Sequence, residues 1–272
     1  MAAQSPSGSI FTQRAGSFVP TGHARGPWDP GALHGGAPAA LMTAEFERMQ
    51  PGAQLRIARL GFELLRPVPS APLTLTTSIV RPGRRVQELA GELRADGQLV
   101  CRGSALRVQP VPAGLPAAGP GRTGAPARMP PPEEVAPVPF ALDAAEGFQE
   151  AGFGASAMEM RPLDDLAVLG PGRVWMRLRY PLLEGEPLTP LMRVAAVADF
   201  ANGVSAVLPF GGYLFINADL SIHLHRPPEG EWVGLDARTI LREGGTGLSE
   251  SVLHDVRGPV GWAFQTLVVQ PR

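Results

Sequence analysis

Two stretches of this chain repeat one pattern, DGQLVCRGSALRVQP at residues 96–110 and RGPVGWAFQTLVVQP at residues 257–271. In both, a glycine suited to a tight turn (Gly97 or Gly258) precedes a run of alternating side chains, and a Gln-Pro pair begins twelve positions after the glycine. Alternation of this kind is typical of a β-strand with one buried face. Gly258 lies 161 positions after Gly97. Recurrence of a whole pattern at a fixed distance indicates an internal duplication.

A second match lies upstream of each of these stretches. LLRPVPSAPLTLTTSIVRPGRR, residues 64–85, is similar to LHRPPEGEWVGLDARTILREGGTG, residues 224–247. The Arg-Pro pairs that begin at Arg66 and Arg226 are 160 positions apart. The two copies therefore share the order of several elements, which makes the duplication a property of the whole fold.

Each copy is predicted to contain one helix followed by three or four strands. The helices are expected in HGGAPAALMTAEFERM, residues 34–49, and TPLMRVAAVADFANGVSAVL, residues 189–208. The runs that follow are rich in β-branched and aromatic residues and are separated by turn glycines, namely Gly83, Gly97, Gly244, Gly245 and Gly258. One helix followed by an antiparallel meander predicts an α+β fold, with the helix packed on one face of the sheet.

Composition excludes several classes of function. The chain has 272 residues and a formal net charge of -1, so it offers no basic surface for nucleic acid or an anionic membrane. All 24 basic residues are arginines, which excludes Schiff-base chemistry on a lysine. Cys101 is the single cysteine, so we expect a buried structural thiol, no disulfide and a reducing cytoplasm. A signal peptide and a membrane-spanning run of roughly 20 apolar residues are both missing.

A tract rich in Pro, Ala and Gly separates the two copies. It reads PVPAGLPAAGPGRTGAPARMPPPEEVAPVP, and proline removes backbone donors while glycine raises the entropic cost of order. We therefore predict an extended linker over the surface. The predicted organisation is an N-terminal repeat at 1–110, the linker at 111–139 and a C-terminal repeat at 140–272.

The second predicted helix carries one carboxylate in an apolar setting. In MRVAAVADFANG, residues 192–203, Asp199 is surrounded by small apolar residues, and Arg193 is six positions away. Burial of an unpaired charge is costly, so a fold retains such a group where it is satisfied or useful. On the last strand, alternation places Gln265 on a face with aliphatic residues, where its amide also needs a partner. We expect Asp199 and Gln265 to meet, with Asp199 as a general base or as the group that orients a water.

The first copy lacks this polar pair. Subtracting 160 from Asp199 gives Ala39, and subtracting 161 from Gln265 gives Ser104. Features present in both copies most simply serve the fold, whereas a pair present in one copy is a better candidate for a single site per chain.

Four segments, in this order and together with the duplication, resemble the acyl-CoA thioesterase II family and its thioesterase-like actinobacterial relatives. They are WDPGALHGG (28–36), AVADFANG (196–203), DLSIHLHRPPEGEW (219–232) and GWAFQTLVV (261–269). The resemblance implies a double hotdog, in which an antiparallel sheet wraps a helix twice in one chain. It also implies hydrolysis of acyl-CoA to a free fatty acid and CoA, with no cofactor.

The resemblance further implies the catalytic residues. The family holds the attacking water with an Asp on the second helix, a Gln on the last strand and a Thr on a strand between them. Asp199 and Gln265 match the first two positions. The third position falls near Asn217, a departure that removes the hydroxyl. Ser221 is nearby and is predicted by alternation to lie on the same side of the strand as Asn217.

Substrate binding is assigned to two further segments. Backbone N–H groups at a helix start can polarise a thioester carbonyl, so His34, Gly35 and Gly36 are the candidate donor region, close packing being the alternative. Arg226 is expected either to meet a phosphate of CoA or to pair with an acidic neighbour.

Other chemistries are poorly supported by the sequence. His223 and His225 lack a third ligand at an ordinary spacing, so we expect no metal site. The chain has no G-x-S-x-G elbow and no dinucleotide-binding fingerprint. Two alternatives stay open. A non-catalytic acyl- or CoA-binding protein is compatible with Asn217, whereas a dehydratase would need a His beside Asp199, whose helix has none. A homodimer or higher homo-oligomer is also compatible with this fold.

Overall fold

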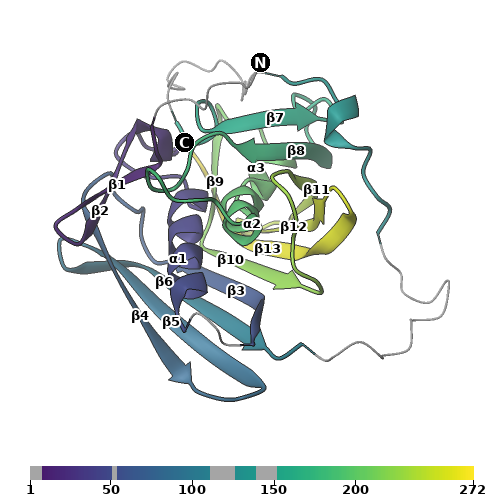
Figure 1. Cartoon of the computed structure of the whole chain (residues 1–272). Helices are drawn as coiled ribbons and strands as arrows, with labels where there is room; N and C mark the ends of the chain where they lie inside the picture. The colour runs from purple at the N-terminus through teal and green to yellow at the C-terminus, as the bar shows by residue number, and fades with distance from the viewer. Residues whose placement is uncertain (1–7, 51–53, 111–125, 139–151) are drawn as a thin grey trace.

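The computed structural model describes residues 8–50, 54–110, 126–138 and 152–272, and its dominant element is one antiparallel sheet that curves around two central helices (Figure 1). The first half contains β1 (Phe11–Arg14), β2 (Ser17–Pro20), α1 (Gly36–Arg48), β3 (Arg56–Leu64), β4 (Leu73–Arg81), β5 (Val86–Ala95) and β6 (Gln98–Val108). The second half contains β7 (Met158–Pro162), β8 (Gly172–Leu178), α2 (Pro190–Ala198), α3 (Ala201–Val204), β9 (Tyr213–Asn217), β10 (Asp219–Leu224), β11 (Val233–Leu241), β12 (Thr246–Asp255) and β13 (Gly258–Pro271). The predicted α+β class is confirmed.

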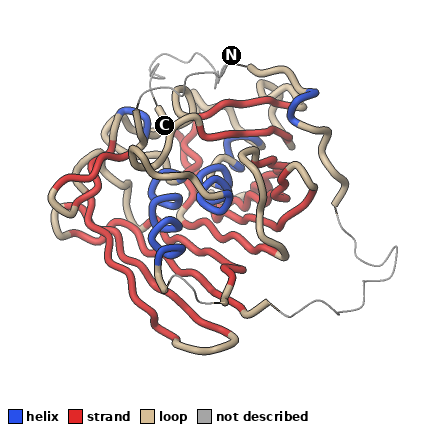
Figure 2. Tube along the Cα trace, in the orientation of Figure 1, coloured by secondary structure: helices blue, strands red, loops and turns tan. Residues whose placement is uncertain are grey.

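The two halves join along β3 and β10, which pair antiparallel in the middle of the sheet. Among the described residues the strand order is β1-β2-β4-β5-β6-β3-β10-β13-β12-β11-β8-β7, with β9 paired to β13 off this path. The order outward from the junction is the same on both sides, so the halves are related by an approximate twofold axis. Figure 2 shows the helices lying together inside this curved sheet. The helix predicted at 34–49 and the meander of each repeat are confirmed, whereas the flanking strands β1, β2, β7 and β8 are additions that the repeat did not predict.

Strand pairing fixes the offset of the duplication at 160 across β3 to β6 and β9 to β13. The irregularity between Leu93 and Arg94 in the β5–β6 hairpin recurs between Leu253 and His254 in the β12–β13 hairpin. The alignment of Gly97 with Gly258 at 161 is wrong by one residue.

The two hairpin turns explain this error. Asp96 and Gly97, both with positive φ, form the first turn, whereas Gly258 is already the first residue of β13. The structural counterpart of Gln265 is therefore Ala105 rather than Ser104, because Ser249 pairs with Gln265 as Leu89 pairs with Ala105.

Helices α1 and α2 cross at equivalent positions of the two repeats. Both helices are almost entirely buried, and a Cβ built on Gly36 would lie 2.3 Å from the carbonyl oxygen of Ala196, its counterpart at an offset of 160. The single helix predicted at 189–208 is wrong, because α2 ends at Ala198 and α3 begins at Ala201. Asp199 and Phe200 occupy the break.

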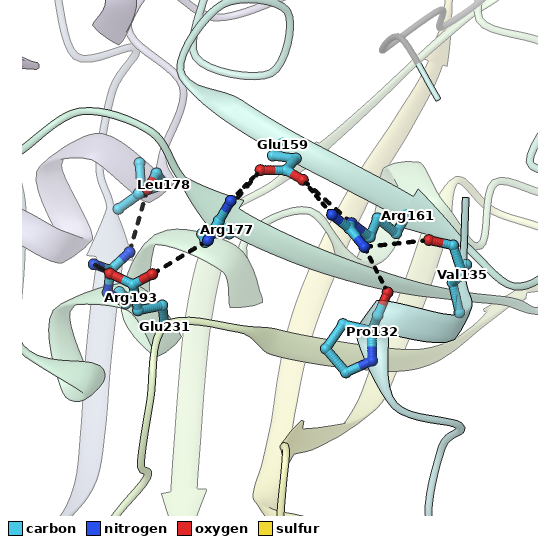
Figure 3. Close-up of polar contacts among 8 residues, drawn as sticks. All are labelled: Pro132, Val135, Glu159, Arg161, Arg177, Leu178, Arg193 and Glu231. Atoms are coloured by element: carbon cyan, nitrogen blue, oxygen red, sulfur yellow. Dashed lines mark hydrogen bonds and ion pairs between the residues drawn. The ribbon is translucent and has the colours of Figure 1, made fainter. Parts of the chain in front are cut away.

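A network of charged side chains anchors α2 to the sheet (Figure 3). Arg193 of α2 donates to the carbonyl of Leu178 at 3.2 Å and to Glu231 at 3.1 Å. Arg177 of β8 connects Glu231 to Glu159 of β7, at 3.2 and 2.6 Å. The helix that precedes Asp199 is thus fixed by polar contacts in addition to its apolar burial.

Part of the predicted linker packs against the second half. Trp175 donates its indole N–H to the carbonyl of Pro130 at 2.8 Å, and Arg161 donates to the carbonyl of Pro132 at 2.8 Å, the latter visible in Figure 3. Residues 126–138 are therefore held on β7 and β8. The rest of the predicted linker lies outside the described residues, so the division into 1–110, 111–139 and 140–272 stays a prediction.

Arg226 anchors the loop after β10. Its guanidinium makes two parallel hydrogen bonds to Asp255, at 2.5 and 2.6 Å, and Asp255 is only 2% exposed. Burial works to raise the pKa of Asp255, but the hydrogen bonds from the Arg226 side chain and from the backbone N–H groups of Arg257 and Glu229 outweigh it and hold the pKa below its ordinary value. The sequence predicts that Arg226 either meets a phosphate of CoA or pairs with an acidic neighbour. The structure contains the second of these contacts.

We expect Arg226→Gln to destabilise the protein by about 3 kcal/mol at neutral pH, because it leaves a buried carboxylate without its cation. A carboxyl with a depressed pKa stabilises the folded state above its unfolded pKa, and this stabilisation is lost as the pH falls through the folded value. The difference between variant and parent should therefore shrink near pH 4, where Asp255 of the variant takes up a proton. Urea denaturation at both pH values measures it, and a difference independent of pH would contradict the assignment.

Cys101 is buried, as predicted. Burial raises the pKa of its thiol to about 12, with smaller contributions from Asp199 and Glu63. A thiol in this state is a poor nucleophile at neutral pH. Among the described residues, no helix combines the length and the apolar character that crossing a bilayer requires.

Candidate active site

A cavity of about 600 Å³ opens beside the break between α2 and α3. Most of its wall is apolar, with Trp28, Leu33, Val68, Phe200 and Phe210 among the lining residues. The polar lining includes Asp199, Asn217, His34 and Gly35, which come from both halves of the chain. An apolar cavity with a few converging polar groups is the usual form of a small-molecule site.

Asp199 is the centre of this polar group. It caps the C-terminus of α2 and is 4% exposed. One carboxylate oxygen, Oδ1, accepts hydrogen bonds from Nδ2 of Asn217 at 2.8 Å and from Nε2 of Gln265 at 3.3 Å. The other oxygen, Oδ2, lies 2.9 Å from Nδ1 of His34. The carboxylate is therefore held in one orientation by three side chains from three different elements.

Gln265 spans the helix break with its amide group. The N–H of Asn202 donates to Oε1 at 3.0 Å, and Nε2 donates to the carbonyl of Asp199 at 3.1 Å. Both backbone groups lose their helical partners where the chain leaves α2. Gln265 is fully buried and does not line the cavity. It meets Asp199 as the sequence predicted, and it holds the backbone on both sides of the break.

We expect Gln265→Leu to lower the free energy of unfolding by about 2 kcal/mol, because two buried backbone groups lose their partners. Turnover should fall roughly 10- to 100-fold, because Asp199 is no longer held in place. The matched control is Ser249→Ala on the neighbouring strand, since the buried Ser249 hydroxyl has no partner among the described residues. Denaturation and product release measure both effects. Loss of stability with unchanged turnover would reduce Gln265 to a structural residue.

Asn217 and Ser221 lie on opposite faces of the sheet, contrary to the prediction from alternation. Asn217 pairs with Leu267, whereas Ser221 pairs with Phe264, so the chain gains one residue at the break between β9 and β10. The extra residue, Ala218, reverses the alternation. Asn217 is consequently buried against Asp199, and Ser221 does not line the cavity.

His34 reaches Asp199 from the segment before α1. Its ring stacks on Phe200 at 4.1 Å between centroids, and its side chain is 11% exposed. The N–H of Gly36 also approaches Nδ1, at 3.1 Å. One ring nitrogen cannot both donate to a carboxylate and accept from an amide, so an ionised Asp199 selects the form with a proton on Nδ1. Nε2 has no hydrogen-bond partner within the described part of the chain and is left for a molecule in the cavity.

Gly35 lies directly against the carboxylate. A Cβ at this position would lie 2.7 Å from Oδ2 and 3.0 Å from Oδ1 of Asp199. Its own N–H has no hydrogen-bond partner among the residues that the structure describes, and it stands at the start of α1. An unpaired N–H at a helix start is suited to bind a negatively charged oxygen.

The position related to this site by the duplication contains no such polar group. The counterparts of Asp199, Gln265, Asn217 and His34 at an offset of 160 are Ala39, Ala105, Ile57 and Val194. All four are apolar, so the described residues form one polar site per chain, in agreement with the asymmetry seen in the sequence. Neither Arg226 nor the pair His223 and His225 lines the cavity. Within the described ranges, no group of three or more His, Cys, Asp or Glu residues is arranged to hold a metal ion.

Two family models match the chain. The model described as the acyl-CoA thioesterase N-terminal domain matches residues 24–108, and the one described as the acyl-CoA thioesterase C-terminal domain matches residues 132–269. A search of curated protein sequences finds no match.

Solved structures share the fold over nearly the whole chain. A candidate thioesterase II from Thermobifida fusca YX has a TM-score of 0.71 at 17% identity, covering 96% of this chain and 95% of that one. Acyl-CoA thioesterase II TesB2 from Mycobacterium marinum has a TM-score of 0.63 at 15% identity, covering 89% and 92%. A conserved protein with the hot dog fold from Alicyclobacillus acidocaldarius has a TM-score of 0.68 at 16% identity, covering 96% and 95%. The predicted double hotdog is confirmed.

Proposed function

This chain belongs to the acyl-CoA thioesterase family, and from that premise we propose that it hydrolyses acyl-CoA thioesters with a water activated at Asp199. The observation that carries the proposal is the fixed Asp199 carboxylate beside the unpaired N–H of Gly35, both on the wall of one apolar cavity. A base and an oxyanion donor side by side are the two groups that thioester hydrolysis requires. The apolar wall suits an acyl chain.

The proposed reaction has two steps. The oxygen of the water forms a bond to the carbonyl carbon while Asp199 takes the proton, and the carbonyl oxygen becomes negatively charged against the N–H of Gly35. The carbon–sulfur bond then breaks, and the departing thiolate takes the proton back from Asp199. The products are a free carboxylic acid and CoA.

The surrounding side chains support this assignment by fixing the base. Asn217 and Gln265 both donate to Oδ1, which leaves Oδ2 as the oxygen for the water, beside His34. Replacement of the family's Thr by Asn217 keeps a polar contact of 2.8 Å to Asp199. The alternative of a non-catalytic binding protein depends on Asn217 being unable to replace the Thr. The contact of Asn217 with Asp199 argues against that alternative.

One observation favours a second candidate function, the dehydration of a 3-hydroxyacyl thioester. A dehydratase was disfavoured because the helix with Asp199 has no His, but His34 lies 2.9 Å from Asp199 and comes from the other half of the chain. A His and an Asp side by side provide the base and the acid that elimination of water requires. The geometry alone thus suits both reactions, and the family supports hydrolysis.

One assay tests both functions. Acyl-CoAs from short to long are incubated with the protein and the free thiol is measured, while 3-hydroxyacyl-CoA is followed by the absorbance of the enoyl product. Thiol release supports the proposal. Enoyl formation without thiol release would replace it with the dehydratase, and binding of acyl-CoA without either product would make the chain a binding protein.

We further propose that the protein works in the cytoplasm, as a homo-oligomer. The single buried thiol, Cys101, is compatible with a reducing compartment. Each chain already combines residues of both halves in one site, so activity does not depend on a second copy. Light scattering during size-exclusion chromatography measures the oligomeric state.

A further inference from the structure

Arg66 and Arg226 occupy the same position in the two repeats but have different surroundings. The backbone is paired in the same way just before both residues. The N–H of Leu65 donates to the carbonyl of Val100, and the N–H of His225 donates to the carbonyl of Val260. Both pairs are related by the offset of 160. The side chains that follow can therefore be compared directly.

Arg226 has all of its donors engaged around Asp255. Besides the two hydrogen bonds to that carboxylate, it donates to the carbonyls of Pro259 at 3.0 Å, Gly258 at 2.8 Å and Pro227 at 3.3 Å. The counterpart of Asp255 in the first repeat is Ala95, which is buried and offers no charge. Arg66 has thus lost the carboxylate that its counterpart uses.

Arg66 lines the cavity that contains Asp199, and it is exposed. It has no hydrogen bond or ion pair with any of the described residues. Its loop is nevertheless fixed, because the N–H of Leu33 donates to the carbonyl of Val68 at 2.8 Å and the N–H of Ser70 donates to that of Gly31 at 2.8 Å. The backbone that carries Arg66 is thereby fixed at the cavity, on a loop bonded to the segment that leads into His34.

We propose that Arg66 binds a phosphate group of the carrier to which the acyl chain is attached. Arginine is suited to this role because its planar group donates two parallel hydrogen bonds to a phosphate. In an acyl thioester of CoA the phosphates are separated from the thioester by the pantetheine arm, so an exposed residue on the wall is placed for them and a buried one is not. The inference rests on the proposed function and names the part of the substrate that it had left open.

The test compares three thioesters of one acyl chain. Acyl-CoA carries nucleotide phosphates and the pantetheine phosphate, acyl-4′-phosphopantetheine carries the latter alone, and acyl-pantetheine carries neither. In Arg66→Gln we expect KM for acyl-CoA to rise roughly tenfold, the effect of one charge-assisted contact, with kcat nearly unchanged. KM for acyl-pantetheine should stay the same. Arg81→Gln is the matched control, because Arg81 is also exposed and does not line the cavity.

Each outcome has a defined meaning. A higher KM for both phosphorylated substrates assigns the contact to the pantetheine phosphate, and a higher KM for acyl-CoA alone assigns it to the nucleotide. An unchanged KM for acyl-CoA, or an equal rise for acyl-pantetheine, overturns the proposal. If the parent protein hydrolyses none of the three, the proposed function fails separately. Calorimetric titration of CoA into parent and variant then decides, since equal affinities overturn the role of Arg66.

Discussion

Asp199→Asn should reduce kcat for acyl-CoA hydrolysis by about three orders of magnitude, the middle of the range for loss of a general base. The fold should survive the change, because the carbonyl oxygen of the new amide can still accept from Asn217 and Gln265, as Oδ1 does now. Its NH₂ group would face Nδ1 of His34, which can accept in its other tautomer. Thiol release measures kcat, and thermal unfolding followed by circular dichroism checks the fold.

A comparison with His34→Gln separates two explanations for the loss of activity in Asp199→Asn, namely that Asp199 or that His34 is the base. With Asp199 as the base, His34 orients and stabilises the carboxylate, and its replacement should lower kcat by roughly 10- to 100-fold. With His34 as the base and Asp199 as its orienting partner, both variants should lose about the same activity, because the two residues would then act as one unit. An Asp199→Asn variant that retains a tenth or more of the parent activity would move the site elsewhere.

The repeat pattern predicts the meander of each half and the first helix. Alternation along GWAFQTLVV placed Gln265 on the core face, and the structure buries it there. The same rule failed at Ser221, because it assumes an unbroken strand, and Ala218 inserts one residue between β9 and β10. A single extra residue leaves no signal in composition, so the phase of the alternation could not be known beyond it.

The break in the second predicted helix also has no signal in the sequence. Small apolar residues continue through it, and no proline or positive-φ residue marks Asp199 or Phe200. The break exists because Gln265, from a strand 66 positions away, satisfies the backbone groups on both sides of it. Tertiary contacts of this kind override local propensity.

His34 illustrates a contact that the duplication could have predicted. It lies two residues before Gly36, and Asp199 lies three residues after Ala196, the residue that Gly36 meets at the helix crossing. Had the crossing been placed at equivalent positions of the two repeats, His34 and Asp199 would have been expected to meet. The helix of Asp199 itself contains no histidine, so a prediction confined to that helix misses the pair.

Gly35→Ala should lower kcat/KM by roughly 10- to 100-fold. The added methyl group would lie 2.7 Å from Oδ2 of Asp199, so the carboxylate must move by several tenths of an ångström. Displacement of a reacting group by about 1 Å costs roughly 100-fold in rate. Gly35 has φ −60° and ψ −25°, which alanine adopts without strain, so the backbone itself gives no reason for a loss of stability.

The control for this variant is Gly211→Ala, where an added Cβ meets nothing within 4 Å. It should behave as the parent protein in both thermal unfolding and thiol release. Gly35→Ala also separates two roles of this position, its contact with the Asp199 carboxylate and the donation of its backbone N–H. The variant keeps the N–H and changes only the contact. A fall in kcat follows from displacement of the base, whereas a rise in KM alone would mean that the methyl group obstructs the substrate and leaves Asp199 in place. Unchanged kinetics would show that the carboxylate position is not critical, and the mechanism based on Asp199 would then have to be abandoned.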